Sequence, residues 1–335
     1  MFTKIRVAVT RQCEMACIYC PRGPNINMEN YDGYEEYCMT AKEILGILSV
    51  LVSQGLKDVH FTGGEPLRRA DLVSLIRQTT QLGTHVELNT NGLGMTAKKA
   101  LQFKEAGLDF IKISLDAPNR GAFLAFTGLD AFEKVVAGIK AAVSIMPVRL
   151  NCVVMRYNLN SLVPLIRMAN ELGVQKIHLL DLTYYPCVGG KEFWEREFVY
   201  LTKEVMAPLE QEFSNKFQLM PIYGCRFYEM ESMPGGTVVV LKEAQPTMRA
   251  EDHCDQCPGY CHEGVFTLRL SAGGYLNFCP CMNKYGFNSL QLWREGKLAQ
   301  ALQEFSQIFD KARPVDSFSL FLEKNGLCYK GGRVV

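Results

Sequence analysis

The chain has 335 residues and a formal net charge of +1, from 36 basic and 35 acidic side chains. This balance predicts no general attraction to nucleic acid or to an anionic membrane, and a hydrophobic content of 48% is ordinary for a globular protein. The length allows one large α/β domain with an appended region.

The start of the chain is a predicted strand and lacks the charged and apolar regions of a signal peptide. No apolar run approaches the length of a membrane span. Thirteen cysteines without a secretion signal are expected to be reduced thiols and metal ligands rather than disulfides. We therefore expect an oxygen-sensitive cytoplasmic protein with no nucleic-acid or membrane partner. The sequence leaves the oligomeric state open.

Strands and helices alternate through the first half of the chain, which predicts a parallel sheet with right-handed crossovers. Six such units indicate an α/β fold, a partial (β/α)6 barrel of the TIM type with its site at the carboxyl ends of the strands. An open doubly wound sheet is the alternative. The expected strands are Ile5–Thr10, Asp58–Thr62, Val86–Thr90, Phe110–Leu115, Val148–Met155 and Ile177–Leu182. The expected helices are Ala41–Gln54, Ala70–Leu82, Ala97–Ala106, Ala131–Ser144 and Leu162–Leu172.

This alternation stops after about residue 184. A longer helix is predicted over Glu192–Phe213, irregular structure over 214–250, a cysteine-rich region over His253–Met282 and a helical tail over Ser289–Leu322. We therefore predict a barrel over residues 1–185, a connecting region over 186–250 and a C-terminal cysteine-rich domain over 251–335.

Three cysteines, Cys13, Cys17 and Cys20, have the spacing C-x3-C-x2-C on the loop that leaves the first strand. Thiolates this close in sequence can converge on one soft metal centre. Three is one fewer than an ordinary four-iron cluster takes, so one iron would stay open to a ligand from outside the protein. The alternatives are three unrelated core cysteines, or a zinc site with Cys38 as a fourth ligand.

This motif after the first strand resembles that of the radical SAM family. The resemblance implies that the three cysteines hold a [4Fe–4S] cluster whose open iron binds S-adenosylmethionine (SAM). The segment Phe61–Leu67, which follows the second strand, contains Gly-Gly-Glu-Pro and is similar to the family motif that binds the SAM amino group. Taken alone, it would also fit a plain Gly-Gly turn.

Further polar residues follow the later strands, where a barrel of this kind builds its site. The resemblance implies contacts with the ribose and carboxylate of SAM from the third to fifth strands, and an aromatic ring beside the adenine. The SAM-binding residues predicted in this way are Tyr19, Gly63, Gly64, Glu65, Pro66, Asn89, Ser114, Asn151 and Arg156.

A second group of cysteines flanks a predicted β-hairpin formed by Val265–Leu270 and a strand that begins at Tyr275. Cysteines before and after a hairpin can close on one metal, and zinc is the main alternative to iron. The pattern resembles the SPASM and Twitch branch of the family, which implies a second, auxiliary Fe–S cluster, expected to be [4Fe–4S]. Its predicted ligands are Cys254, Cys257, Cys261 and Cys279, with Cys281 or Cys225 as alternatives.

Segments such as Leu150–Arg156 and Leu268–Gly274 narrow the resemblance to the GTP 3′,8-cyclase family. In that family several basic residues grip GTP, and Arg6 and Arg269 match two of them. Asp58 and His60 stand where two others would be, and a further hairpin arginine is replaced by Thr267. Fewer cations facing a triphosphate weaken the case for GTP. We predict that Arg6, His60 and Arg269 are the catalytic residues that face the substrate.

The leading hypothesis is a radical SAM enzyme that takes hydrogen from a small polar, nucleotide-like metabolite, with an electron donor such as flavodoxin or ferredoxin. GTP 3′,8-cyclase activity is one alternative. A ribosomal-peptide maturase is another, although such enzymes usually carry a leader-binding module before the barrel. A non-catalytic metal-binding scaffold would lack the SAM site.

Overall fold

The computed structural model describes residues 2–20, 37–184, 190–222, 225–230, 235–243, 247–250, 254, 260, 267–278 and 286–334. One sheet of 12 strands, in the order β13-β12-β11-β1-β2-β3-β4-β5-β6-β9-β8-β7, organises this part of the chain. Its strands are β1 (Lys4–Ala8), β2 (Asp58–Thr62), β3 (His85–Thr90), β4 (Phe110–Ser114), β5 (Val148–Val153), β6 (Lys176–Leu180), β7 (Phe217–Ile222), β8 (Cys225–Met230), β9 (Val238–Glu243), β11 (Thr267–Leu270), β12 (Tyr275–Asn277) and β13 (Phe287–Asn288).

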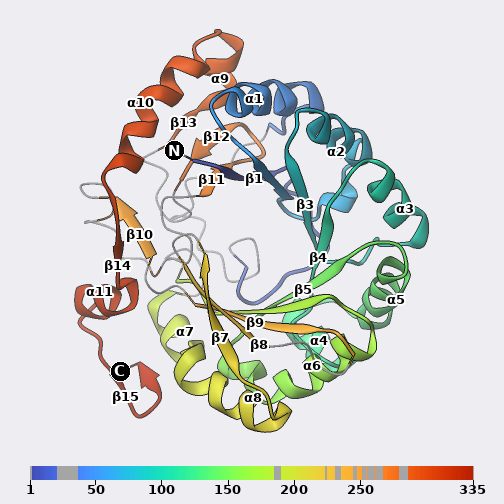
Figure 1. The fold of residues 1–335 in the computed structure, drawn as a ribbon, viewed down its shortest axis with the longest axis vertical. Helices are drawn as coiled ribbons and strands as arrows, with labels where there is room; N and C mark the ends of the chain where they lie inside the picture. Colours follow the sequence, from blue (N-terminus) through green and yellow to red (C-terminus); the bar gives the residue numbers. More distant parts are fainter. Residues whose placement is uncertain are drawn as a thin grey trace.

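Strands β1 to β6 are parallel neighbours joined by helices, so the predicted partial (β/α)6 barrel is confirmed. Figure 1 shows the strands as a curved wall around a central axis, with the helices outside it. The helices are α1 (Ala41–Ser53), α2 (Leu72–Gln81), α3 (Ala97–Glu105), α4 (Arg120–Thr127), α5 (Phe132–Val143), α6 (Leu162–Glu171), α7 (Gly190–Glu197), α8 (Met206–Phe213), α9 (Ser289–Arg294), α10 (Leu298–Asp310) and α11 (Ser317–Lys324).

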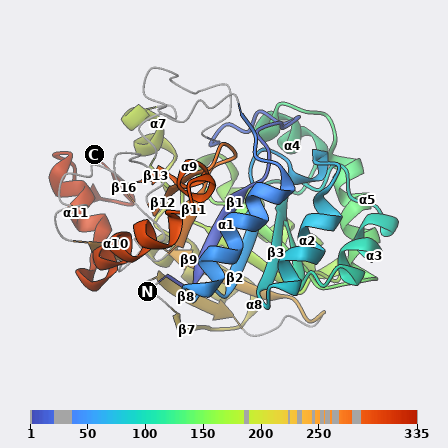
Figure 2. The same cartoon turned by 90° about the horizontal axis from the view of Figure 1, so that it is seen from above.

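Local sequence explains where these helices begin. Helix α1 starts with a capping box in which the Thr40 hydroxyl accepts from the Glu43 amide and Glu43 accepts from the Thr40 amide. Glu43 also pairs with Arg294 on α9, so the same carboxylate ties the first helix to the C-terminal region. Figure 2 shows α1, α2 and α3 side by side along the strands.

The two faces of the barrel wall differ in polarity. Residues that point toward the helices, such as Ile5, Val59 and Ile111, have no exposed surface. Alternate residues on the inner face are polar, so that Arg6 lies opposite His60 and His60 lies opposite Glu87. TIM-type barrels usually fill this interior with apolar layers. The polar inner face of this barrel therefore differs from that usual filling.

The hairpin of β11 and β12 is confirmed, but its place in the sheet was not predicted. Strand β11 pairs in parallel with β1, and Arg269 is the register partner of Arg6. The C-terminal region thus extends the sheet beyond its first strand. In Figure 1, α10, β14 (Ala312–Val315) and α11 lie on the side of the ring opposite α3 and α5.

The long helix predicted over Glu192–Phe213 is wrong. The segment forms α7, a π-helical turn (Leu201–Val205) and α8, with residues 198–200 non-helical between them. Phe198 and Tyr200 pack there into a buried aromatic cluster around Trp194, with which Phe198 stacks at 4.4 Å. Burial of these rings outweighs the helical periodicity of the segment.

Residues 214–250, predicted to be irregular, contain strands instead. Strand β9 continues the barrel parallel to β6, while β8 and β7 follow in antiparallel order. Strand β10 (Thr247–Ala250) pairs with β14, which interrupts the predicted helical tail between α10 and α11. Of these strands, β9 could have been predicted, because Val238–Glu243 begins with three β-branched residues, which favour strands.

No helix among the described residues is long and apolar enough to cross a membrane.

Candidate active site

The cysteine loop leaves the carboxyl end of β1 and is held by backbone hydrogen bonds to the end of α4. The Ala16 amide donates to the Thr127 carbonyl at 2.8 Å, and the Ile18 amide donates to the Phe126 carbonyl at 3.1 Å. A turn closed by the Cys20 amide and the Cys17 carbonyl at 3.0 Å brings the last two cysteines together. The loop is therefore fixed by groups outside itself.

The three thiols share one electrostatic environment. Burial raises the pKa of the Cys17 thiol, and nearby Asp116, Cys20 and Cys13 raise it further. Burial likewise raises the pKa of Cys13. Such thiols are protonated on their own, whereas iron would hold them as thiolates and remove the mutual penalty. The raised pKa values of Cys13 and Cys17 thus fit thiols that an Fe–S cluster would hold as thiolates. Among the described residues, no three His, Cys, Asp or Glu side chains are grouped so that they could hold a single metal ion.

Gly63 and Gly64 allow two loops to touch along their backbones. The Gly64 amide donates to the Thr10 carbonyl at 2.7 Å, and the Glu65 amide donates to the Gln12 carbonyl at 2.6 Å. A Cβ atom on either glycine would overlap a backbone carbonyl of the cysteine loop, and Gly63 has a φ of +136°. Both positions therefore require glycine.

The Glu65 carboxylate is buried and fully occupied by protein groups. It accepts from the Thr90 hydroxyl at 2.5 Å, from the Asn91 amide at 2.6 Å and from the Leu67 amide at 2.9 Å. Burial raises its pKa, opposed by these hydrogen bonds. Glu65 thus braces the end of β3 against the glycine loop. Pro66, also buried, begins the 3-10 turn Pro66–Arg68 that follows.

Tyr19 connects the cysteine loop to the end of β4. Its hydroxyl donates to Asp116 Oδ2 at 2.9 Å, and the Val153 amide donates to Asp116 Oδ1 at 2.8 Å. Burial raises the pKa of Asp116 to about 7. The Tyr19 ring also meets Phe126 edge to face at 5.8 Å.

Three predicted polar residues, Asn89, Ser114 and Asn151, lie on the inner face near the carboxyl ends of β3, β4 and β5. Ser114 and Asn151 are register partners. Each side chain is half-buried, and none makes a hydrogen bond to another described residue. Their polar groups are thus available to a ligand on the same side of the sheet as the cysteine loop.

Comparison with known proteins agrees with this geometry. A model of the radical SAM superfamily matches residues 7–169. A protein of Saccharolobus solfataricus named "Probable GTP 3′,8-cyclase" is 39% identical over 280 residues, which cover 82% of each chain. The chain belongs to the radical SAM superfamily. It is therefore a radical SAM enzyme, and [4Fe–4S] and SAM are the cofactors that membership implies.

Other matches agree. A Pyrococcus horikoshii protein with the same name is 32% identical over 282 residues, covering 83% of each chain. The crystal structure of Streptococcus suis SuiB bound to S-adenosylmethionine shares the fold, with a TM-score of 0.61 at 14% identity over 90% of this chain and 68% of that chain.

In this radical SAM enzyme the remaining predicted SAM contact, Arg156, is held by the protein itself. Its guanidinium pairs with Glu204 and donates to the Gly332 carbonyl. The Tyr329 hydroxyl donates to the other Glu204 oxygen at 2.8 Å. Arg156 thus anchors the C-terminal hairpin β15 (Tyr329–Lys330) and β16 (Arg333–Val334) near the end of β5.

Two charged residues on the inner wall, Glu87 and Lys112, were not predicted as site residues. Lys112 Nζ lies 2.7 Å from Glu87 Oε2, and Glu87 Oε2 lies 3.0 Å from His60 Nδ1. Arg149 and His178 join the same face from β5 and β6. Their sequence signal is a polar residue at every second position of the strand. Buried parallel strands are usually continuous apolar runs instead.

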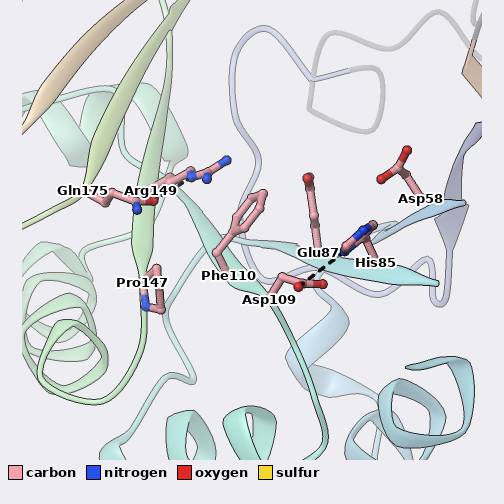
Figure 3. Close-up of a pocket in the computed structure, with 8 residues that line it drawn as sticks. All are labelled: Asp58, His85, Glu87, Asp109, Phe110, Pro147, Arg149 and Gln175. Atoms are coloured by element: carbon pink, nitrogen blue, oxygen red, sulfur yellow. Dashed lines mark hydrogen bonds and ion pairs between the residues drawn. The ribbon is translucent and has the colours of Figure 1, made fainter. Parts of the chain in front are cut away.

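A cavity of about 370 Å³ opens at the amino ends of the strands, away from the cysteine loop. Figure 3 shows Arg149 beside the Phe110 ring, with its guanidinium 3.5 Å from the ring centroid, and Glu87 on the other side. His85 Nδ1 lies 3.6 Å from Asp109 Oδ1 at the rim. Glu87 lines this cavity and also contacts His60, so it connects the cavity at the amino ends of the strands to the inner face of the barrel.

The predicted auxiliary-cluster ligands fall mostly outside the described residues. Cys257, Cys261 and Cys279 lie there, and Cys254 is described, with its amide donating to the Ala250 carbonyl at 2.9 Å. Tyr260, next to Cys261 in the sequence, is fully buried, and its hydroxyl donates to Asp181 Oδ2 at 2.5 Å.

Proposed function

We propose that this radical SAM enzyme takes hydrogen from a small anionic, nucleotide-like metabolite bound inside the barrel. The observation that carries the proposal is the register pairing of Arg6 with Arg269. Two guanidinium groups from opposite ends of the chain thereby share the inner wall. Guanidinium groups suit phosphate and carboxylate recognition because they donate paired, charge-assisted hydrogen bonds.

We assign Cys13, Cys17 and Cys20 as the ligands of the SAM-binding cluster. Bound there, the cluster and SAM supply a 5′-deoxyadenosyl radical. Asn89, Ser114 and Asn151, whose side chains have no hydrogen-bond partner among the described residues, offer polar groups for SAM from the neighbouring strand ends. The barrel walls then hold the substrate carbon near the radical and exclude water. A low-potential donor such as flavodoxin or ferredoxin would reduce the cluster.

We also propose the auxiliary Fe–S cluster, with Cys254, Cys257, Cys261 and Cys279 as ligands. The Tyr260–Asp181 hydrogen bond supports it, because Asp181 directly follows β6. That contact holds Tyr260, the neighbour of Cys261 in the sequence, beside the residue that follows the carboxyl end of β6. An enzyme with both clusters should bind about eight irons per chain after anaerobic reconstitution, and one with a single cluster about four.

The test is substrate-dependent formation of 5′-deoxyadenosine by the reconstituted, reduced enzyme with SAM and a panel of nucleotides. We expect a nucleotide to raise the rate, and Arg269→Gln to lower it at least tenfold at limiting substrate. Arg120→Gln is the matched control, because Arg120 lies on the surface, where it pairs with Asp130. If uncharged metabolites or peptides stimulate the reaction and nucleotides do not, the proposal is wrong.

A second candidate is GTP 3′,8-cyclisation. The identity of 38–39% to proteins named for that activity over 82% of the chain favours it. Asp58 and His60, at positions that are basic in that family, count against it. Formation of a 3′,8-cyclised product from GTP would establish this activity, and stimulation by other nucleotides without that product would exclude it.

A further inference from the structure

His60 occupies the middle of the barrel wall. Its neighbours on β2, Val59 and Phe61, point outward and have no exposed surface, so His60 points inward. It lies in register between Arg6 on β1 and Glu87 on β3. Only 3% of the residue is exposed.

One carboxylate oxygen joins three strands at this point. Glu87 Oε2 lies 3.0 Å from His60 Nδ1 and 2.7 Å from Lys112 Nζ. Burial opposes ionisation of Glu87, but contacts with His60 and Lys112 hold its pKa well below the usual range. The Lys112 charge is thus already neutralised by Glu87 and is not free for a phosphate group.

The imidazole of His60 is neutral near pH 7. Burial lowers its pKa to about 4, and the charges of Lys112 and Lys4 favour the same direction against the contact with Glu87. A neutral imidazole carries one proton, and a carboxylate beside Nδ1 favours the proton on that atom. The other nitrogen, Nε2, is then an acceptor.

That acceptor has no partner. Nε2 is buried and makes no hydrogen bond in the part of the chain that the structure describes; Nδ1 also lacks a hydrogen bond of good geometry there, although it lies 3.0 Å from Glu87 Oε2. Buried polar atoms are almost always paired, because an unpaired one loses its hydration without compensation. An orphaned acceptor on the inner wall of an enzyme barrel indicates a donor supplied by the ligand.

We propose that His60 Nε2 accepts a hydrogen bond from a neutral hydroxyl or N–H group of the substrate, with Glu87 as the positioning residue that fixes the ring tautomer. The inner face of β2 to β4 then hydrogen-bonds the sugar or base of a nucleotide, while Arg6 and Arg269 bind its anionic end. This inference rests on the proposed function.

The tautomer can be tested without a ligand. Ring-nitrogen NMR of the holoenzyme labelled with ¹⁵N-histidine, assigned with His60→Gln, should show a neutral ring protonated on Nδ1 from pH 5.5 to 8. Glu87→Gln should shift the ring toward the other tautomer. A His60 that titrates near pH 6.5, or that is protonated on Nε2, would overturn the inference.

The contact is tested by equilibrium dialysis of the SAM-loaded holoenzyme with guanosine, GMP and GTP, which share a base and sugar and differ in charge. His60→Leu should weaken all three by a similar factor, about tenfold, because the lost contact involves their common part. His60→Gln should retain affinity through its amide oxygen. Arg269→Gln should weaken only GMP and GTP, and exposed His85→Gln should weaken none.

The outcomes separate the two proposals. If wild-type enzyme binds the probes and His60→Leu changes nothing, or weakens GTP alone, the inference fails while the proposed function stands. If wild-type enzyme binds none of the three, the inference fails, while the proposed function is judged by the wider nucleotide panel.

Discussion

The Tyr19 hydroxyl donates a hydrogen bond of 2.9 Å to the buried Asp116 carboxylate. Tyr19 lies between the second and third cysteines of the cluster motif, and Asp116 follows β4. The same carboxylate accepts from the Val153 amide at the end of β5. One side chain thus sets the position of the cysteine loop relative to two strands that carry predicted SAM contacts.

Tyr19→Phe should therefore lower catalysis without removing iron. Loss of the hydroxyl leaves one oxygen of a buried carboxylate unpaired, which costs about 1–3 kcal/mol and lets the loop shift. We expect 5′-deoxyadenosine formation to fall about tenfold while iron content stays near wild type. Tyr157→Phe, at a ring that is 53% exposed, should have no effect. Equal rates for Tyr19→Phe and wild type would contradict this role.

Gly64→Ala should impair assembly of the cluster. The added methyl group would overlap backbone of the cysteine loop, so the loop must move at a cost of about 2 kcal/mol. Iron content and the visible absorbance of the cluster should both drop. Gly121→Ala is the control, since its nearest atom would be Asn119 Oδ1 at 3.6 Å. Full iron loading of Gly64→Ala would show that the loop contact is dispensable.

Cys17→Ala should abolish SAM cleavage while the chain still folds. Removing one of three iron ligands destroys the site, but it leaves the barrel packing intact. Circular dichroism should resemble that of wild type, and 5′-deoxyadenosine should be absent. Cys38→Ala, at an exposed thiol, should keep activity. Activity of Cys17→Ala, or inactivity of Cys38→Ala, would favour a different ligand set.

The two buried histidines should lower the stability of the fold as the pH falls below about 6.5, and buried Asp116, whose pKa is raised to about 7, should offset part of this loss. Burial lowers the pKa of His60 to about 4 and that of His178 to about 3, while an unfolded histidine titrates near 6.5. Between these values the unfolded chain binds more protons, so acid favours unfolding. Urea denaturation should show a loss of about 1 kcal/mol per pH unit for each ring below pH 6.

Variants separate this effect from general acid sensitivity. His60→Gln and His178→Gln should each flatten the pH dependence, and the double variant should flatten it further. His85→Gln should keep the wild-type slope, because the His85 side chain is 75% exposed. An unchanged slope in His60→Gln would mean that this ring does not titrate on unfolding.

The six βα units could be predicted because the apolar residues of each helix or strand recur with the period of that structure, and capping and turn residues mark where each one ends. The place of the later strands could not. Nothing local to Thr267–Leu270 indicates that it pairs with β1, and nothing in Val238–Glu243 names β6 as its neighbour. The helix predicted over Glu192–Phe213 failed for a related reason, since the aromatic cluster that receives Phe198 and Tyr200 includes Tyr260 and Phe318 from far along the chain.

The candidate site divides in the same way. The cysteines, the glycine pair and the polar strand ends are recognisable because each directly follows a strand in sequence. Glu87 and Lys112 lie mid-strand, and only the register of neighbouring strands brings their charges together. The Arg156 guanidinium pairs with Glu204 and donates a hydrogen bond to the Gly332 carbonyl. These contacts likewise depend on segments that only tertiary packing brings to Arg156.

The parallel pairing of β11 with β1 also has a consequence for biosynthesis. The ribosome releases β1 first, yet its second neighbour emerges only after residue 270. Until then one edge of the first strand has no partner, and such edges invite misassociation. The wall around the cysteine loop also stays incomplete throughout that interval. Iron delivery therefore has a period during translation in which the first motif is made and the strand that pairs with β1 from the C-terminal region is not.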